Sequence, residues 1–144
     1  MTVDEIIAML DAAESGNSIY DLRIARFVGW TNQIGYTDGG AKILAFAERH
    51  ADAGRSEAVA CLAEDMDLPS YTTSVDAALT LVPEDWRVWM SVRCGHADAY
   101  LMRPEEKENI FGQRRWSSRG CPEWMSAPTL PLAICIICLA ARKP

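Results

Sequence analysis

The sequence predicts an α+β fold, in which helices sandwich a small, mainly antiparallel three-stranded sheet (α/β/α) with an added helical N-terminal region. Three observations lead to this prediction. Acidic segments with apolar residues at helical spacing fill residues 1–69, the apolar period changes to two after Pro83, and an apolar segment closes the chain at 130–141. We therefore expect a helical region at 1–69, packed on the core, and a sandwich domain at 70–144, together forming one compact unit.

The N-terminal region is expected to hold four short helices. Thr2 and Glu5 have the spacing of a capping box, in which each side chain accepts a hydrogen bond from the other residue's backbone N–H. The remaining helices are bounded by residues that typically cap or break helices. These are Asn17 or Ser18 and Gly29 for the second, Asp38 after a loop at 31–37 for the third, and Ser56 and Pro69 for the fourth.

The sandwich domain begins with one more helix and then changes to strands. Thr73 and Asp76 again have capping-box spacing, and Pro83 ends the helix because the residue before a proline disfavours the α conformation. Alternating side chains follow, and the short turn at 94–95 pairs the first two strands antiparallel. We expect strands at 86–93, 96–103 and 110–117, a polar turn at 104–109 and a loop at 117–125.

A final helix begins near Ser126 or Thr129 and is apolar nearly all round, so we expect it to be covered on both sides. It contains Cys135 and Cys138 in a C-x-x-C arrangement, which suggests redox chemistry or zinc binding. Their apolar neighbours favour buried structural thiols instead, because reactive cysteines need an electropositive and partly exposed setting. We expect both to be buried, reduced and metal-free. The odd total of five cysteines also disfavours a disulfide framework.

The charge of this 144-residue chain is unevenly distributed. Residues 1–70 hold 12 acidic and 5 basic residues, a net charge of −7, whereas residues 71–144 hold 8 acidic and 9 basic residues, a net charge of +1. Such a dipolar molecule is suited to association with partners. No secretory signal is expected, and the longest apolar run, about 12 residues, is shorter than the ~20 needed to cross a bilayer. We expect a cytoplasmic protein with no membrane partner.

Two blocks of the second half resemble a known family. Ser70 to Trp86 reads S-Y-T-T-S-V-D-A-A-L-T-L-V-P-E-D-W, and after a two-strand unit Ala127 to Cys135 reads A-P-T-L-P-L-A-I-C. Together they resemble the phage ABA sandwich domain over about residues 70–142. The family's closing helix usually opens A-T-P, and this chain has Ala-Pro-Thr there. The resemblance implies a phage or prophage protein acting in the cytoplasm of a bacterial host, and it supplies no catalytic residue.

An aromatic and basic set of side chains lies on the expected strands. Flat aromatic rings beside guanidinium groups are suited to stacking on a base and pairing with a phosphate. They are equally suited to anchoring a protein interface. The alternative is that one tryptophan packs beneath a helix. The candidate binding residues are Arg87, Trp89 and Arg93 on one strand face, Arg114 and Trp116 on one face of the third strand, and Arg115 between them.

A weaker candidate set is His96, Asp98 and Tyr100, which alternate onto one sheet face. A histidine oriented by an aspartate can act as a general base, but no serine or cysteine nucleophile has a defined position beside it. His50, the other histidine, lies on the apolar stripe of its helix and is interpreted as structural. No glycine-rich phosphate loop is present, since Asp38-Gly39-Gly40 lacks the spacing and the following lysine. The sequence therefore predicts no catalytic residue, metal ligand or cofactor.

Three functional hypotheses remain open. The first is a non-enzymatic phage accessory protein that binds and inhibits a host defence protein or complex. The second is a protein that sequesters a nucleotide-type signalling ligand in a pocket between protomers. The third is a small hydrolase that uses His96 and Asp98. We rank them in that order, expect no direct DNA binding, and expect a homo-oligomer because a short sheet leaves edges to be covered.

Overall fold

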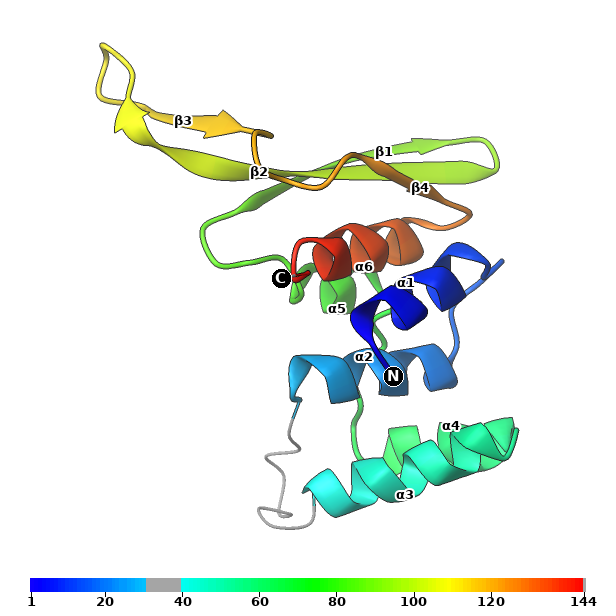
Figure 1. The fold of residues 1–144 in the computed structure, drawn as a ribbon. Coiled ribbons are helices and arrows are strands. Elements are labelled where there is room, and N and C mark those ends of the chain that lie inside the picture. The colour runs from blue at the N-terminus through cyan, green and yellow to red at the C-terminus, as the bar shows by residue number, and fades with distance from the viewer. Residues whose placement is uncertain (31–39, 144) are drawn as a thin grey trace.

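The computed structural model describes residues 1–30 and 40–143, and in these it contains six helices and four strands (Figure 1). The helices are α1 (Val3–Asp11), α2 (Ser18–Val28), α3 (Gly40–Asp52), α4 (Ser56–Asp65), α5 (Val75–Leu79) and α6 (Leu130–Ala140). The strands are β1 (Arg87–Arg93), β2 (His96–Glu108), β3 (Arg114–Ser117) and β4 (Met125–Ala127). The predicted α+β class is confirmed.

The sheet is antiparallel throughout and centres on the long strand β2. β1 pairs with one edge of β2, while β3 and β4 pair with the other edge at different heights. The turn at 94–95 sets the register of the first pair, with Arg93 opposite His96 and Trp89 opposite Tyr100. The predicted pairing of 86–93 with 96–103 is therefore correct.

Three strand predictions need correction. The segment 104–109 is not a turn, because β2 continues to Glu108, and the third strand begins at Arg114 rather than at residue 110. The reversal lies at 109–113, where the Asn109 carboxamide oxygen accepts hydrogen bonds from the N–H groups of Phe111 and Gln113, both at 2.9 Å. A fourth strand, β4, occupies the end of the expected loop and the first of the two expected helix starts, Ser126, whereas the second, Thr129, is the N-cap of α6.

Helix α6 is the central layer of the molecule. Its residues 131–139 are all buried, because the sheet covers one side and α1 and α5 cover the other (Figure 1). The expectation that both sides of this helix are covered is confirmed. Helix α2 packs against α1, and α3 and α4 lie farthest from the sheet. Among the residues that the structure describes, no helix combines the length and apolar character needed to cross a membrane.

The expected burial of both C-x-x-C cysteines is confirmed. Cys135 and Cys138 are fully buried in α6, and the Cys135 thiol donates to the Tyr71 carbonyl oxygen at 3.1 Å. Burial raises the pKa of both thiols, that of Cys138 to about 12. Both thiols therefore stay protonated near neutral pH, which is typical of buried structural cysteines.

The predicted helix caps are largely found. Thr2 and Glu5 form the reciprocal capping box, and the Asn17 side chain accepts from the Tyr20 N–H at 2.9 Å. The cap of α5 is Ser74 rather than Thr73, one residue later than the capping-box spacing indicated. The expected loop at 31–37 and the cap at Asp38 lie outside the described residues.

A buried polar contact joins the N-terminal helices to the second half of the chain. The Asp21 carboxylate on α2 accepts hydrogen bonds from the Thr72 hydroxyl at 2.7 Å and from the Thr72 N–H at 2.8 Å. Thr72 Oγ1 also accepts from the Asn17 N–H at 3.0 Å. Gly16 lies against the same residue, since a Cβ atom there would stand 2.1 Å from the Thr72 carbonyl oxygen. Only glycine permits this approach.

Candidate functional site

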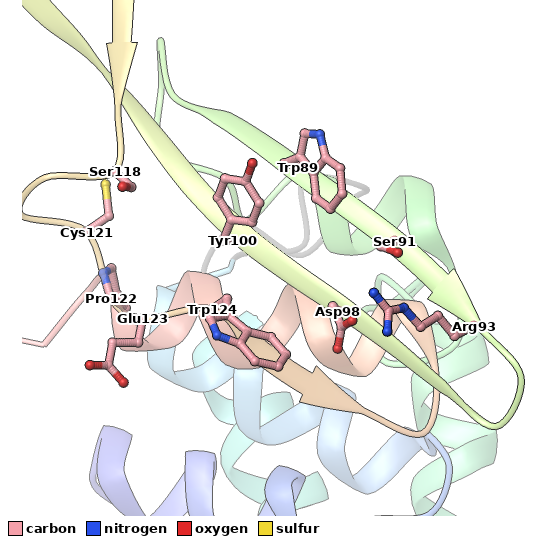
Figure 2. Close-up of a pocket in the computed structure, with 10 residues that line it drawn as sticks. All are labelled: Trp89, Ser91, Arg93, Asp98, Tyr100, Ser118, Cys121, Pro122, Glu123 and Trp124. Carbon is pink, nitrogen blue, oxygen red and sulfur yellow. The ribbon is translucent and has the colours of Figure 1, made fainter.

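A pocket of about 710 Å³ lies on the face of the sheet that points away from α6 (Figure 2). Strict alternation along β2 creates this face, because Ala97, Ala99 and Leu101 are buried towards α6 while the residues between them point the other way. The loop between β3 and β4 forms the remaining wall. The lining residues are Trp89, Ser91 and Arg93 from β1, Asp98 and Tyr100 from β2, and Ser118, Cys121, Pro122, Glu123 and Trp124 from the loop.

Aromatic side chains dominate the pocket. Trp89 and Tyr100 are cross-strand partners whose rings stack with centroids 5.2 Å apart and planes 25° apart. Trp124 lies across the hollow from them in Figure 2. Trp89 is 49% exposed and Trp124 is 62% exposed, although large aromatic rings gain considerable free energy when buried. Exposed aromatic surface around a cavity is typical of a binding site.

The pocket also holds charged groups of both signs. Figure 2 shows the Arg93 guanidinium directed into the hollow beside Asp98, with Glu123 on the opposite wall. Asp98 accepts a hydrogen bond from the Ser126 hydroxyl at 2.7 Å, which fixes the carboxylate position and leaves its second oxygen available. In the described part of the chain, Arg93 takes part in no ion pair. The site can therefore offer a free cation and a fixed hydrogen-bond acceptor.

The arrangement around His96 does not form a nucleophile–base pair. His96 Nε2 and Asp98 Oδ2 are 4.0 Å apart, which is beyond hydrogen-bond distance, and His96 is not among the residues that line the pocket. Ser126 bonds to the aspartate and not to the histidine. A hydrolytic triad needs the imidazole between the hydroxyl and the carboxylate, whereas here the carboxylate lies between the other two groups.

The predicted site residues divide into two groups. Trp89 and Arg93, with the weaker candidates Asp98 and Tyr100, come together in the pocket. Arg87 instead lies over the Trp116 ring, 4.0 Å from its centroid, as a cation–π pair outside the pocket. The two remaining candidates on β3, which are exposed and line no part of the pocket, are Arg114 and Arg115.

Sequence reasoning missed the wall formed by the loop. Trp124 lies in a segment rich in glycine and proline, which the sequence marks as a loop without indicating its course. The loop is held by local contacts: the Arg119 N–H donates to Ser117 Oγ, and Gly120 has a φ of 77° with the Arg103 guanidinium against it. The available signal was an isolated tryptophan in a loop directly before an apolar helix.

No group of three or more histidine, cysteine or acidic side chains in the described residues is arranged to hold a metal ion. No protein-family model, curated protein or solved structure matches this chain. The resemblance of residues 70–142 to the phage ABA sandwich domain therefore stays a prediction.

Proposed function

We propose that this protein binds a small nucleotide-type ligand in the pocket and acts stoichiometrically rather than as an enzyme. The observation that supports this most directly is the exposed Trp89–Tyr100 stack, which faces Trp124 across a cavity of about 710 Å³. The Trp89–Tyr100 stack on one side of the hollow and Trp124 on the other offer flat surfaces that suit a planar ring. Pockets of this size commonly enclose ligands of nucleotide dimensions.

The polar groups of the pocket complement the other parts of a nucleotide. A base stacked on the free face of Trp89 or Tyr100 gains about 1–3 kcal/mol from that contact, and Trp124 across the hollow offers a further ring. The free oxygen of Asp98 is suited to accept from an amino group or ring N–H of the base. Arg93, which has no competing ion pair in the described residues, is suited to bind a phosphate with two parallel hydrogen bonds.

This proposal keeps the sequence-based hypothesis of a phage or prophage protein that sequesters a nucleotide signal in the cytoplasm of its host, but it places the ligand in a pocket within one chain rather than between protomers. A non-enzymatic role is favoured because the imidazole of His96 and the hydroxyl of Ser126 do not contact each other. Sequestration requires only affinity and abundance. The signal's identity would follow from the small molecules released when the purified protein is heated.

A second candidate function is binding and inhibition of a host protein. One observation favours it. Ile110 and Phe111 are almost fully exposed at the tip of the β2–β3 hairpin, where Asn109 holds the turn in one conformation. Adjacent exposed apolar residues on a fixed turn are suited to enter a groove in a partner. A partner retained by Trp124→Ala but lost with Phe111→Ser would support this second function over the first.

The test of the proposed function is to titrate the purified protein with mononucleotides and cyclic dinucleotides. Binding is measured by tryptophan fluorescence and by calorimetry. We expect one member of the panel to quench the fluorescence with saturating stoichiometry. Trp124→Ala and Arg93→Ala should each weaken that binding by about 10- to 100-fold, corresponding to ~1.4–2.8 kcal/mol. Arg115→Ala is the matched control, because this exposed arginine lies outside the pocket. Equal binding by all variants, or no binding of any nucleotide, would refute the proposal.

A further inference from the structure

Strand β1 forms one edge of the sheet, and its outer side pairs with no strand in the described residues. In an antiparallel pair joined by a two-residue turn, alternate residues direct their N–H and C=O groups towards the partner strand. Arg93 and His96 flank the two-residue turn and therefore form a hydrogen-bonded pair. By alternation, the backbone groups of Ser91 and Trp89 also point towards β2. The backbone groups of Val88, Met90 and Val92 therefore point outwards, and they form an open hydrogen-bonding edge.

Apart from an arginine at each end, this edge lacks the features that usually prevent association between sheets. Edge strands are normally protected by charged residues, proline or a bulge. Between Arg87 and Arg93, β1 carries none of these, and its register with β2 is uninterrupted. Met90 and Val92, on the face that α6 covers elsewhere, are 38% and 69% exposed. The residues whose backbone groups point outwards, Val88, Met90 and Val92, therefore all carry apolar side chains.

We propose that two copies of this chain pair antiparallel through their β1 strands, with the two Ser91 residues opposite each other at the two-fold axis. The most exposed apolar side chains of the strand then become cross-strand partners, because Met90 lies opposite the partner's Val92. On the other face, Trp89 lies opposite the partner's Arg93, so this register opposes no like charges there. The interface is self-complementary, as a two-fold axis requires.

Two alternative registers, centred on Met90 and on Trp89, are less favourable. A register centred on Met90 would place Arg87 opposite the partner's Arg93, and directly opposed like charges destabilise a strand pair. A register centred on Trp89 would bring the partner's Val92 opposite Trp86. There the chain already turns away from the sheet, with the Trp86 N–H bonded to the Pro83 carbonyl oxygen. At the other end of β1, Val92 and Arg93 are exposed and still belong to the regular strand.

This pairing would continue the sheet across both copies and place both pockets on the same face. Trp89 and Arg93 line the pocket and also lie near the two-fold axis, so the two pockets would adjoin. The inference does not depend on the proposed ligand, because it follows from the edge of the sheet alone. Loss of the dimer and loss of ligand binding can be measured separately.

Disulfide trapping tests the register. In a background with the exposed or partly exposed Cys61, Cys94 and Cys121 replaced by serine, Ser91→Cys should form a covalent dimer under mild oxidation. The Ser91 pair would be a non-hydrogen-bonded pair with Cα atoms about 4.5 Å apart, within the range that a disulfide spans. Met90→Cys is the control and should stay monomeric after oxidation. Trapping through Met90→Cys instead, or through neither position, would overturn the proposed register.

Sedimentation at tens of micromolar tests the association itself. The wild-type chain should sediment as a dimer, and Val92→Lys should be monomeric because it places an ammonium group on the apolar edge. Ile110→Lys is the matched control: Ile110 is 91% exposed and lies on the distant hairpin tip, so the dimer should persist. Circular dichroism should show both variants folded. A monomeric wild type, or a dimer lost with Ile110→Lys and kept with Val92→Lys, would refute the proposal.

Discussion

Replacing Thr72 by valine should destabilise the protein strongly, and the loss should depend on pH. The Thr72 hydroxyl donates to the buried Asp21 carboxylate at 2.7 Å and accepts from the Asn17 N–H at 3.0 Å. Valine has nearly the same shape and can do neither. Because Thr72 is buried, water cannot replace the lost hydroxyl without a rearrangement. The substitution therefore tests how the N-terminal helices are attached to the second half of the chain.

The magnitude follows from the two contacts. A hydrogen bond to a charged group contributes about 1.5–3 kcal/mol, and an ordinary one contributes about 1 kcal/mol. The Thr72 N–H still donates to Asp21 in the variant, so the carboxylate keeps one donor. We expect a loss of about 3 kcal/mol in the free energy of unfolding at neutral pH. For a chain of this size the loss corresponds to a fall of about 10 °C in Tm.

The pH dependence follows from the pKa of Asp21. Burial raises this pKa above its usual value, and the two hydrogen bonds from Thr72 offset the increase only in part. A carboxyl group whose pKa is raised in the folded state stabilises the fold least when it is ionised. Its contribution to the free energy of unfolding therefore increases as pH falls through the folded-state pKa towards 3.8, the ordinary value. Removing a donor to the ionised form raises the pKa further. The difference between wild type and Thr72→Val should therefore be largest at neutral pH and smaller near pH 3.8.

Urea denaturation at both pH values, followed by circular dichroism, measures this difference. Thr73→Val is the matched control, because Thr73 is exposed and neighbours Thr72; its free energy of unfolding should change by less than about 0.5 kcal/mol. In an Asp21→Asn background the cost of Thr72→Val should become independent of pH. A loss below about 1 kcal/mol at neutral pH, or an equal loss at both pH values, would show that this contact does not stabilise the fold as we argue.

Two further predictions concern the same interior. Gly16→Ala should cost about 1–3 kcal/mol, because the new methyl group meets the Thr72 carbonyl at 2.1 Å, whereas Ser15→Ala at the exposed neighbouring position should be nearly neutral in denaturation. A thiol reagent near neutral pH should modify the exposed cysteines and spare Cys135 and Cys138 until the chain unfolds, and elemental analysis should find no stoichiometric zinc; rapid labelling of either buried thiol in the native protein would contradict this expectation.

The part of the site that lies on regular strands could be predicted from the sequence. Alternation along 86–93 and 96–103, joined by a two-residue turn, fixes both the register and the face of every side chain. This is why Trp89 and Arg93 could be assigned to one face of the first strand, and Asp98 and Tyr100 to one face of the second. The sequence analysis kept these as two separate sets, and the structure brings them together in one pocket. The assignment needs only the period of two and the position of the turn.

The pocket wall formed by the loop between β3 and β4 could not be predicted, because the sequence of this segment has no periodic pattern of apolar residues. β4 has three residues, too few to display an alternation, and it pairs with β2 at a distance of about thirty residues along the chain. The charged segment 104–108 reads as a turn because it has no apolar face. The structure continues it as a strand in an extended hairpin, with a register shift next to Pro104.

The pocket and the core share strand β2 but use its opposite faces. Ligand binding and stability should therefore be separable by substitutions on the pocket face. The alternation that directs Asp98 and Tyr100 into the pocket directs Ala97 and Ala99 towards α6, where they are almost completely buried. Enlarging either alanine would force the sheet away from the helix and alter the strand that carries the site. Trimming Trp124 removes a side chain that is mostly exposed and leaves those contacts in place. A variant of Trp124 that loses ligand and keeps its free energy of unfolding would therefore locate the function on the exposed face of the sheet, independently of the fold.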